Sequence, residues 1–257
     1  MYHTNHNFVL EIDPEFLNYK DGIFTPTEGT LYERLPKHGS VQYTQAKSKV
    51  KRGHVGYFIH YALDSLWKQD HKTFISVPNS DLLGYSTDLG KNIKSHSFVV
   101  AEKIKEEEDS PIITQLETQY FTQKFKVRNC DKKLIKGVSR GDILWCWKDS
   151  DYPITYIDDV VFLDAEHIVY NESTDELLNS YVLVEPLDED EEYEMVNGVY
   201  LPRKEKVNKG YGRVLKCNEN DIIKEGDHII YKKTSYNYLK EGVNAVKFEY
   251  IKCYERN

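Results

Sequence analysis

Several side chains stand at spacings that could bind metal, although none completes a recognised site. His3 and His6 lie three residues apart near the N-terminus, where a loosely held pair of histidines is more often chance than a ligand set. The acidic runs 106–109 and 188–192 offer carboxylates that suit calcium. They lack the alternating ligand spacing and the turn glycine of calcium loops, which favours solvated loops. We therefore expect no metal site.

Carboxylate pairs that could support acid–base catalysis occur at Asp149 and Asp151 and at Asp158 and Asp159. No histidine or basic residue is spaced to complete either pair, so we expect these residues to end strands and discourage edge-to-edge pairing. The sequence contains no GxGxxG, GxxxxGK[ST], GxSxG or HExxH motif. We expect no catalytic residue, no cofactor and no enzymatic activity.

Composition narrows the class of protein and its partners. The chain has 257 residues, a formal net charge of -8, 40% hydrophobic residues and 20 tyrosines, which is typical of a folded globular protein. The excess of 42 acidic over 34 basic residues argues against binding nucleic acid, because phosphate binding needs clustered positive charge. No apolar stretch approaches the roughly 18 residues of a membrane span, and no secretory signal opens the chain.

The cysteines point to a reducing compartment. The four cysteines form no CxxC pair and have no metal-like spacing, so we expect reduced thiols and a cytoplasmic protein, with a virion as the alternative. Cys146 lies between Trp145 and Trp147 in an alternating run, and core packing is the favoured role for its thiol.

Three segments of the chain share one internal layout. Each opens with a short apolar run and, about 43 residues later, reaches a glycine that is followed by a second apolar run. The opening runs are 8–10, 98–100 and 181–184, and the glycines are Gly53, Gly141 and Gly226. A third apolar run follows at 74–77, 160–163 and 248–251. We predict three domains at 1–90, 91–175 and 176–257.

The apolar runs are four to six residues long and rich in Val, Ile, Phe and Tyr. Turn residues separate them and no segment keeps a 3.6-residue period, so the sequence predicts an all-β protein of small barrels or sandwiches. The stretch 171–178 could form one short helical turn, and a linker is the favoured interpretation.

The third segment contains four short motifs in a distinctive order. Its first strand ends in Pro186-Leu187, and a loop follows that carries the apolar tag Gly198-Val199-Tyr200-Leu201-Pro202. A Gly-x-Val strand at 212–214 and a Lys-x-Gly-Asp strand at 224–227 complete the order of motifs. The first segment has a weaker match to the tag at 21–26, and the second has Ser-Pro-Ile-Ile-Thr at 110–114. This order of motifs resembles the GroES co-chaperonin family. The resemblance implies three tandem small GroES-like β-barrel domains.

The resemblance also implies how such a protein would work. GroES-like barrels form seven-membered rings, and each barrel extends a mobile loop whose apolar tripeptide docks on a chaperonin. We therefore expect a homo-oligomeric ring that assists protein folding. The expected partner-binding residues are Gly198, Val199, Tyr200, Leu201, Pro202, Ile23, Phe24, Ile112 and Ile113. Val199–Leu201 could equally be another buried strand. The alternative function is a structural ring or collar of a phage virion, associated with the portal or head–tail junction and contacting neighbouring virion ring proteins.

Overall fold

The computed structural model describes fifteen stretches of the chain. They are residues 7–13, 19–20, 23–24, 37–45, 47–59, 65–104, 122–147, 151–153, 160–187, 193–196, 199–202, 209–218, 222–232, 236–240 and 242–255. The chain divides into two compact units. The first unit is Met1–Lys105, Lys124–Ile143 and Asp149–His167, and the second is Glu106–Gln123, Leu144–Lys148 and Ile168–Asn257. The boundaries of the three predicted domains stay a prediction.

The described residues confirm the all-β prediction. Their regular elements are antiparallel strands joined by turns and by three-residue 3-10 helices at Asn79–Asp81, Ala165–His167 and Phe248–Tyr250. None of the helices in these ranges is long and apolar enough to cross a membrane.

The first seven-stranded sheet belongs to the first unit and has the order β6-β7-β1-β4-β5-β8-β9. Its strands are β1 (Asn7–Ile12), β4 (Lys37–Tyr43), β5 (Val55–Phe58), β6 (Leu66–Gln69), β7 (Lys72–Pro78), β8 (Leu82–Ser86) and β9 (Lys94–Ser95). A separate hairpin pairs β2 (Tyr19–Lys20) with β3 (Ile23–Phe24).

The next seven strands divide between the units. In the first unit they are β10 (Val99–Lys103), β11 (Thr122–Asn129), β13 (Asp151–Pro153) and β14 (Val160–Leu163), in the order β13-β14-β10-β11. In the second unit they are β12 (Ile143–Trp147), β15 (Ile168–Asn171) and β16 (Glu176–Leu177), in the order β12-β15-β16.

The second unit also holds a six-stranded sheet with the order β22-β23-β17-β20-β21-β24. Its strands are β17 (Tyr181–Leu187), β20 (Lys209–Lys216), β21 (His228–Lys232), β22 (Tyr236–Lys240), β23 (Val243–Lys247) and β24 (Ile251–Glu255). A second separate hairpin pairs β18 (Tyr193–Val196) with β19 (Val199–Pro202).

One pairing scheme recurs in all three segments. The opening strand, β1, β10 or β17, pairs with β4, β11 or β20 on one side and with β7, β14 or β23 on the other. The register shifts at the same place in the opening strand, at Val9/Leu10, Val100/Ala101 and Leu183/Val184. The sequence repeat therefore corresponds to a repeated order of strand pairing. Closure of each segment into a GroES-like barrel stays a prediction.

Backbone geometry accounts for the glycine that recurs in the three segments. Gly53, Gly141 and Gly226 have φ of 86°, 96° and 91°, a left-handed conformation that strains any residue with a Cβ. Each glycine N–H donates to a carbonyl of the neighbouring strand, at 2.8, 2.9 and 2.8 Å respectively. The turn is therefore held in the same way three times.

Burial alternates along several strands, and this places apolar side chains in the cores. In β7 the burial alternates, and Ile75 and Val77 face a cluster with Phe8, Leu10 and Phe58. Corresponding clusters in the second unit form around Tyr181 and around Val182 and Val184. Each fully buried aliphatic or aromatic side chain contributes about 1.5–3 kcal/mol of transfer free energy.

Two local expectations are wrong. Phe248-Glu-Tyr alternates like a strand but forms a 3-10 helix, and the third apolar strand is β23, whose run is interrupted by Asn244 and Ala245. The stretch 171–178 runs from the last residue of β15 through the hairpin turn and β16, and is neither a helical turn nor a linker. Gly210 and Gly212 belong to β20, an interior strand of the six-stranded sheet. Their missing Cβ atoms leave room for the Tyr231 ring and for Val184.

Candidate functional site

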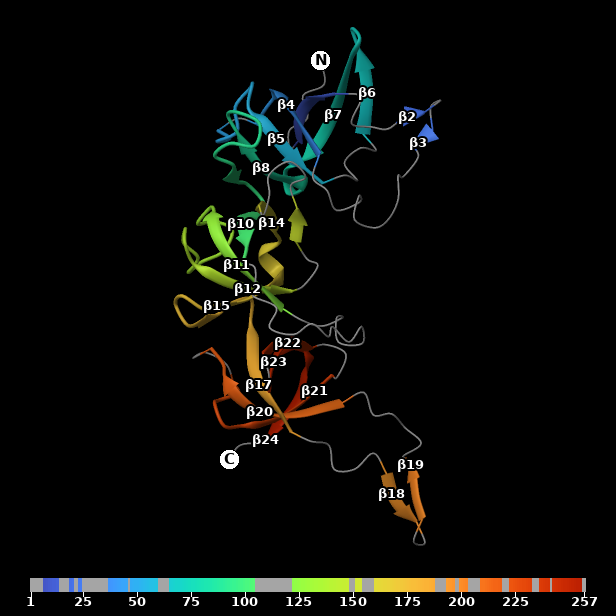
Figure 1. Ribbon diagram of the computed structural model, residues 1–257, viewed down its shortest axis with the longest axis vertical. Coiled ribbons are helices and arrows are strands. Elements are labelled where there is room, and N and C mark those ends of the chain that lie inside the picture. The colour runs from blue at the N-terminus through green and yellow to red at the C-terminus, as the bar shows by residue number, and fades with distance from the viewer. Residues whose placement is uncertain are drawn as a thin grey trace. The chain divides into compact units, whose positions relative to one another are not determined.

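The predicted tag of the third segment lies on the hairpin β18–β19 (Figure 1). Val199–Pro202 form β19, and the backbone register pairs Val199 with Val196 and Leu201 with Glu194. Gly198 itself lies outside the described residues. Val199–Pro202 thus form a strand of a two-stranded hairpin outside the six-stranded sheet.

Of the other predicted docking residues, two lie in a second hairpin and two lie outside the described residues. Ile23 and Phe24 form β3, which pairs with β2 in a short hairpin of its own. Ile112 and Ile113 lie outside the described residues. The two hairpins occupy the same connection of the repeat, because one lies between β1 and β4 and the other between β17 and β20.

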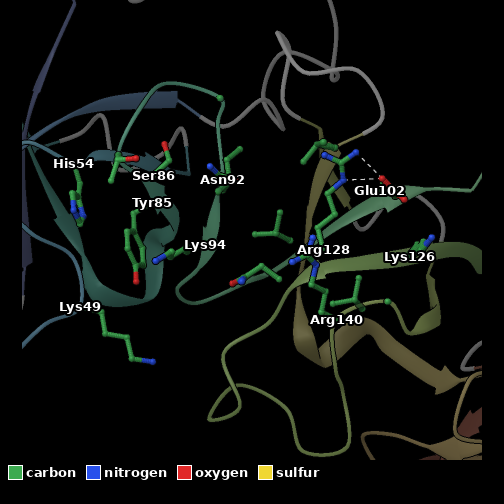
Figure 2. Close-up of a pocket in the computed structure, with 18 of the residues that line it drawn as sticks. Lys49, His54, Tyr85, Ser86, Asn92, Lys94, Glu102, Lys126, Arg128 and Arg140 are labelled. Atoms are coloured by element: carbon green, nitrogen blue, oxygen red, sulfur yellow. Dashed lines mark hydrogen bonds and ion pairs between the residues drawn. The ribbon is translucent and has the colours of Figure 1, made fainter.

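A hollow in the first unit gathers chemistry that the sequence did not point out. Its volume is about 1060 Å³, at the upper end of the 300–1000 Å³ range that is usual for ligand sites. Figure 2 shows Lys49, His54 and Lys94 on one side and Arg128 and Arg140 on the other. Six cationic side chains and one carboxylate line it: Lys49, Lys51, Lys94, Lys126, Arg128, Arg140 and Glu102.

Local structure explains why these side chains reach the hollow. Burial alternates along β11, where Phe125 and Val127 are buried while Lys126 and Arg128 are exposed. Lys94 belongs to the short strand β9, and Arg140 immediately precedes the left-handed glycine of its turn. The apolar floor includes Ile93, Val100 and Val160, which belong to one buried cluster with Tyr57 and Phe162. A buried apolar cluster therefore underlies the charged side chains of the hollow.

Two of the six cations have acidic partners. The Lys49 ammonium lies 2.5 Å from Asp131 Oδ2. This hydrogen bond raises the pKa of Lys49 and lowers the pKa of Asp131. Arg128 donates to Glu102 Oε2 through Nε at 2.7 Å and Nη2 at 2.6 Å. Both guanidinium nitrogens share one carboxylate oxygen, and such charge-assisted hydrogen bonds are stronger than bonds between neutral groups.

The other four cations have no such partner. Among the described residues, no carboxylate lies within 4.0 Å of the charged groups of Lys51, Lys94, Lys126 or Arg140. Lys126 stands opposite Glu102 in the strand register, yet that carboxylate is bound by Arg128. The hollow is therefore positively charged although the whole chain carries a net charge of -8.

The pKa of His54 is affected by this positive charge. Its Nδ1 accepts the backbone N–H of Lys51 at 3.1 Å, and its ring stacks on Tyr85 with centroids 5.5 Å apart. Burial, followed by the positive charges of Lys51 and Lys94, lowers the pKa of His54. The imidazole is therefore held neutral near pH 7.

The same turn position carries an anion in the other two segments. Asp142 Oδ2 accepts the Ser139 N–H at 2.8 Å, and Asp227 Oδ2 accepts the Lys224 N–H at 2.9 Å. His54 makes the equivalent bond without a negative charge. The first segment thus keeps the turn and omits the carboxylate beside the hollow.

The side chains that line the hollow suit the binding of anions better than catalysis. The Ser86 hydroxyl donates to the Asp88 carbonyl at 2.6 Å and lies 3.0 Å from the Tyr57 hydroxyl. Burial raises the pKa of Tyr85, which disfavours its use as a base. Lysine ammonium and arginine guanidinium groups, by contrast, are the usual ligands of phosphate and carboxylate anions.

Sequence reasoning missed this cluster. One local signal was present: Lys124, Lys126 and Arg128 alternate with apolar residues along one strand, which places their side chains on one face. Nothing in the sequence joined them to Lys49, Lys51 or Lys94.

No protein-family model matches the chain, and no curated protein is similar to it in sequence.

Proposed function

We propose that this chain is a non-enzymatic assembly protein of three tandem GroES-like barrels, which forms a homo-oligomeric ring and docks on a chaperonin to assist folding. The hairpin β18–β19, with Val199, Tyr200 and Leu201, is the docking element, and Ile23 and Phe24 are an accessory contact.

One observation carries this proposal. The two hairpins occupy the same connection of a repeated pairing scheme, and each bears the apolar residues of a predicted tag. A hairpin outside the main sheet is suited to reversible docking, since it can engage a partner without unpairing the strands of a core.

Ring formation is supported by the edges of the sheets. In the part of the chain that the structure describes, β6 and β22 are the outermost strands of their sheets. Edge strands of this kind pair readily with another copy of the chain, and a head-to-tail repetition of such a contact closes a ring. Several weak docking contacts in one ring add up to firm attachment.

A second function is favoured by the charge of the chain. A collar of a phage virion must let DNA pass without sticking, and the excess of 42 acidic over 34 basic residues suits that task. In that case the hairpins contact neighbouring rings of the virion instead of a chaperonin.

The test begins with the rotational symmetry of the purified full-length protein, from class averages of electron micrographs and native mass. Sevenfold rings support the co-chaperonin, whereas sixfold or twelvefold rings support the virion collar. A chain that stays monomeric at every concentration contradicts ring assembly.

The docking role is tested with Leu201→Asp in a chaperonin pull-down. A charge in the apolar tag should reduce capture by about tenfold or more, because burying an unpaired carboxylate is costly. Leu89→Asp is the matched control, since Leu89 is 49% exposed and lies outside the tag. Rings that form normally and are captured equally well by both variants would contradict docking through this hairpin.

A further inference from the structure

We propose that the basic hollow of the first unit is a binding site for a compact anion that carries several phosphate groups, such as a nucleoside triphosphate or a short inorganic polyphosphate. This site is independent of the docking hairpins and adds a ligand to an assembly protein.

The first step is the charge imbalance. Lys51, Lys94, Lys126 and Arg140 line one hollow and have no acidic partner among the described residues. Gathering like charges around a concave surface is unfavourable, and the field inside such a cleft is stronger than over a flat face. A ligand with several negative charges would relieve this repulsion, whereas a single small anion would relieve only part of it.

The second step concerns the residue after the repeated glycine, which is His54 in the first segment and an aspartate in the other two. Asp142 and Asp227 show that a carboxylate suits this turn, since each accepts a backbone N–H three residues earlier. The segment that borders the hollow instead has His54, which makes the same bond as a neutral acceptor. A carboxylate here would occupy the positive field near Lys51 and Lys94, so its absence leaves those cations available to a ligand.

The third step is shape. Cations from β9, β11 and the turns before β5 and β12 converge on a space of about 1060 Å³, which suits a small molecule. A nucleic-acid strand is favoured by an extended basic stripe and a positive protein, while this chain carries a net charge of -8. The geometry therefore favours a compact phosphate ligand over a polymer.

The test uses the full-length protein and isothermal titration calorimetry with tripolyphosphate at about 100 mM salt, where distant surface charges are largely screened. We expect saturable binding at one site per chain. Lys126→Ala and Arg140→Ala should each weaken binding by about tenfold, the usual loss for one charge-assisted contact. Lys68→Ala and Arg52→Ala are matched controls, because both residues are exposed and neither lines the hollow.

A variant with the opposite effect separates binding from misfolding. Glu102→Gln removes the carboxylate that holds Arg128 and so adds a free cation to the hollow. We expect tripolyphosphate to bind about threefold to tenfold more tightly to this variant. Damage to the fold would weaken binding, so an increase can arise only from the charge of the site.

Parallel titrations identify the source of the phosphates. ATP binding more tightly than tripolyphosphate indicates a nucleotide site, and equal or weaker ATP binding indicates an inorganic polyphosphate site; both support the proposal. Absence of saturable tripolyphosphate binding overturns it. Equal losses in the site and control variants, or tighter binding of a single-stranded oligonucleotide than of tripolyphosphate, overturn it as well.

Discussion

His54→Asp gives the first segment the carboxylate that the other two segments have at this turn. In the wild-type chain His54 Nδ1 accepts the Lys51 N–H at 3.1 Å. The corresponding bonds to Asp142 and Asp227 are 2.8 and 2.9 Å long. The substitution therefore keeps the hydrogen bond of the turn and changes the charge of its acceptor.

The expected gain in stability follows from three contributions. A charged acceptor strengthens the bond to the Lys51 N–H by about 0.5–1 kcal/mol. Attraction to the ammonium groups of Lys51 and Lys94 adds about 0.3–0.5 kcal/mol each, because both are exposed. Losing the ring stack on Tyr85 costs about 0.5–1 kcal/mol. The net expectation is a variant about 0.5 kcal/mol more stable than the wild type near pH 8.

The advantage should grow as the pH falls. Because the pKa of His54 is lowered in the folded chain, the unfolded chain binds a proton more readily between the folded pKa and about 6.5. The stability that comes from a neutral His54 is therefore present above about pH 6.5 and lost as the pH falls through the folded pKa. An aspartate stays ionised over this range. The difference between variant and wild type should accordingly be larger at about pH 5.5 than at pH 8.

The assay is urea unfolding followed by circular dichroism at both pH values, with a separate fit for each transition if the two units unfold separately. The reverse exchange, Asp142→His, is the control and should lose about 1 kcal/mol because it gives up a charged hydrogen bond. A His54→Asp chain that is no more stable than the wild type at either pH would refute this account of the turn. The same variant should bind tripolyphosphate about tenfold more weakly, since its carboxylate competes for the cations.

Two further expectations concern packing and thiol chemistry. Gly212→Ala should destabilise the second unit by roughly 2–3 kcal/mol, since the added Cβ would lie 2.1 Å from Val184 Cγ1. Gly242→Ala, which has nothing within 4 Å but a φ of 70°, should cost only about 1–2 kcal/mol in a urea titration, and equal losses would contradict the packing argument. Burial, with lesser contributions from nearby aspartates, raises the pKa of the Cys130 thiol to about 11. Its alkylation by iodoacetamide at about pH 8 should therefore be roughly a hundredfold slower than that of glutathione, as mapped by mass spectrometry, and comparable rates would contradict a buried thiol.

Local patterns predicted the strands well where one run of residues carries the whole signal. Tyr181–Val184 and Val160–Leu163 are continuous apolar runs, and both form strands at those positions. Phe248-Glu-Tyr misled because its alternation resembles a strand, while β23 was missed because Asn244 and Ala245 dilute its apolar character. Tertiary packing decided both cases, since residues 244–247 of β23 pair with residues 181–184 of β17.

The sequence by itself determined the features whose cause is local. Short β-branched and aromatic runs, separated by turn residues, predict an all-β chain, and the recurring glycines mark turns that only a residue without a side chain can adopt without strain. Tertiary structure alone decided which residues meet. The cations of the hollow lie between Lys49 and Arg140 in the chain and come together because strands pair and pack across long separations. Such contacts depend on the whole arrangement of sheets, so no local pattern of residue types encodes them.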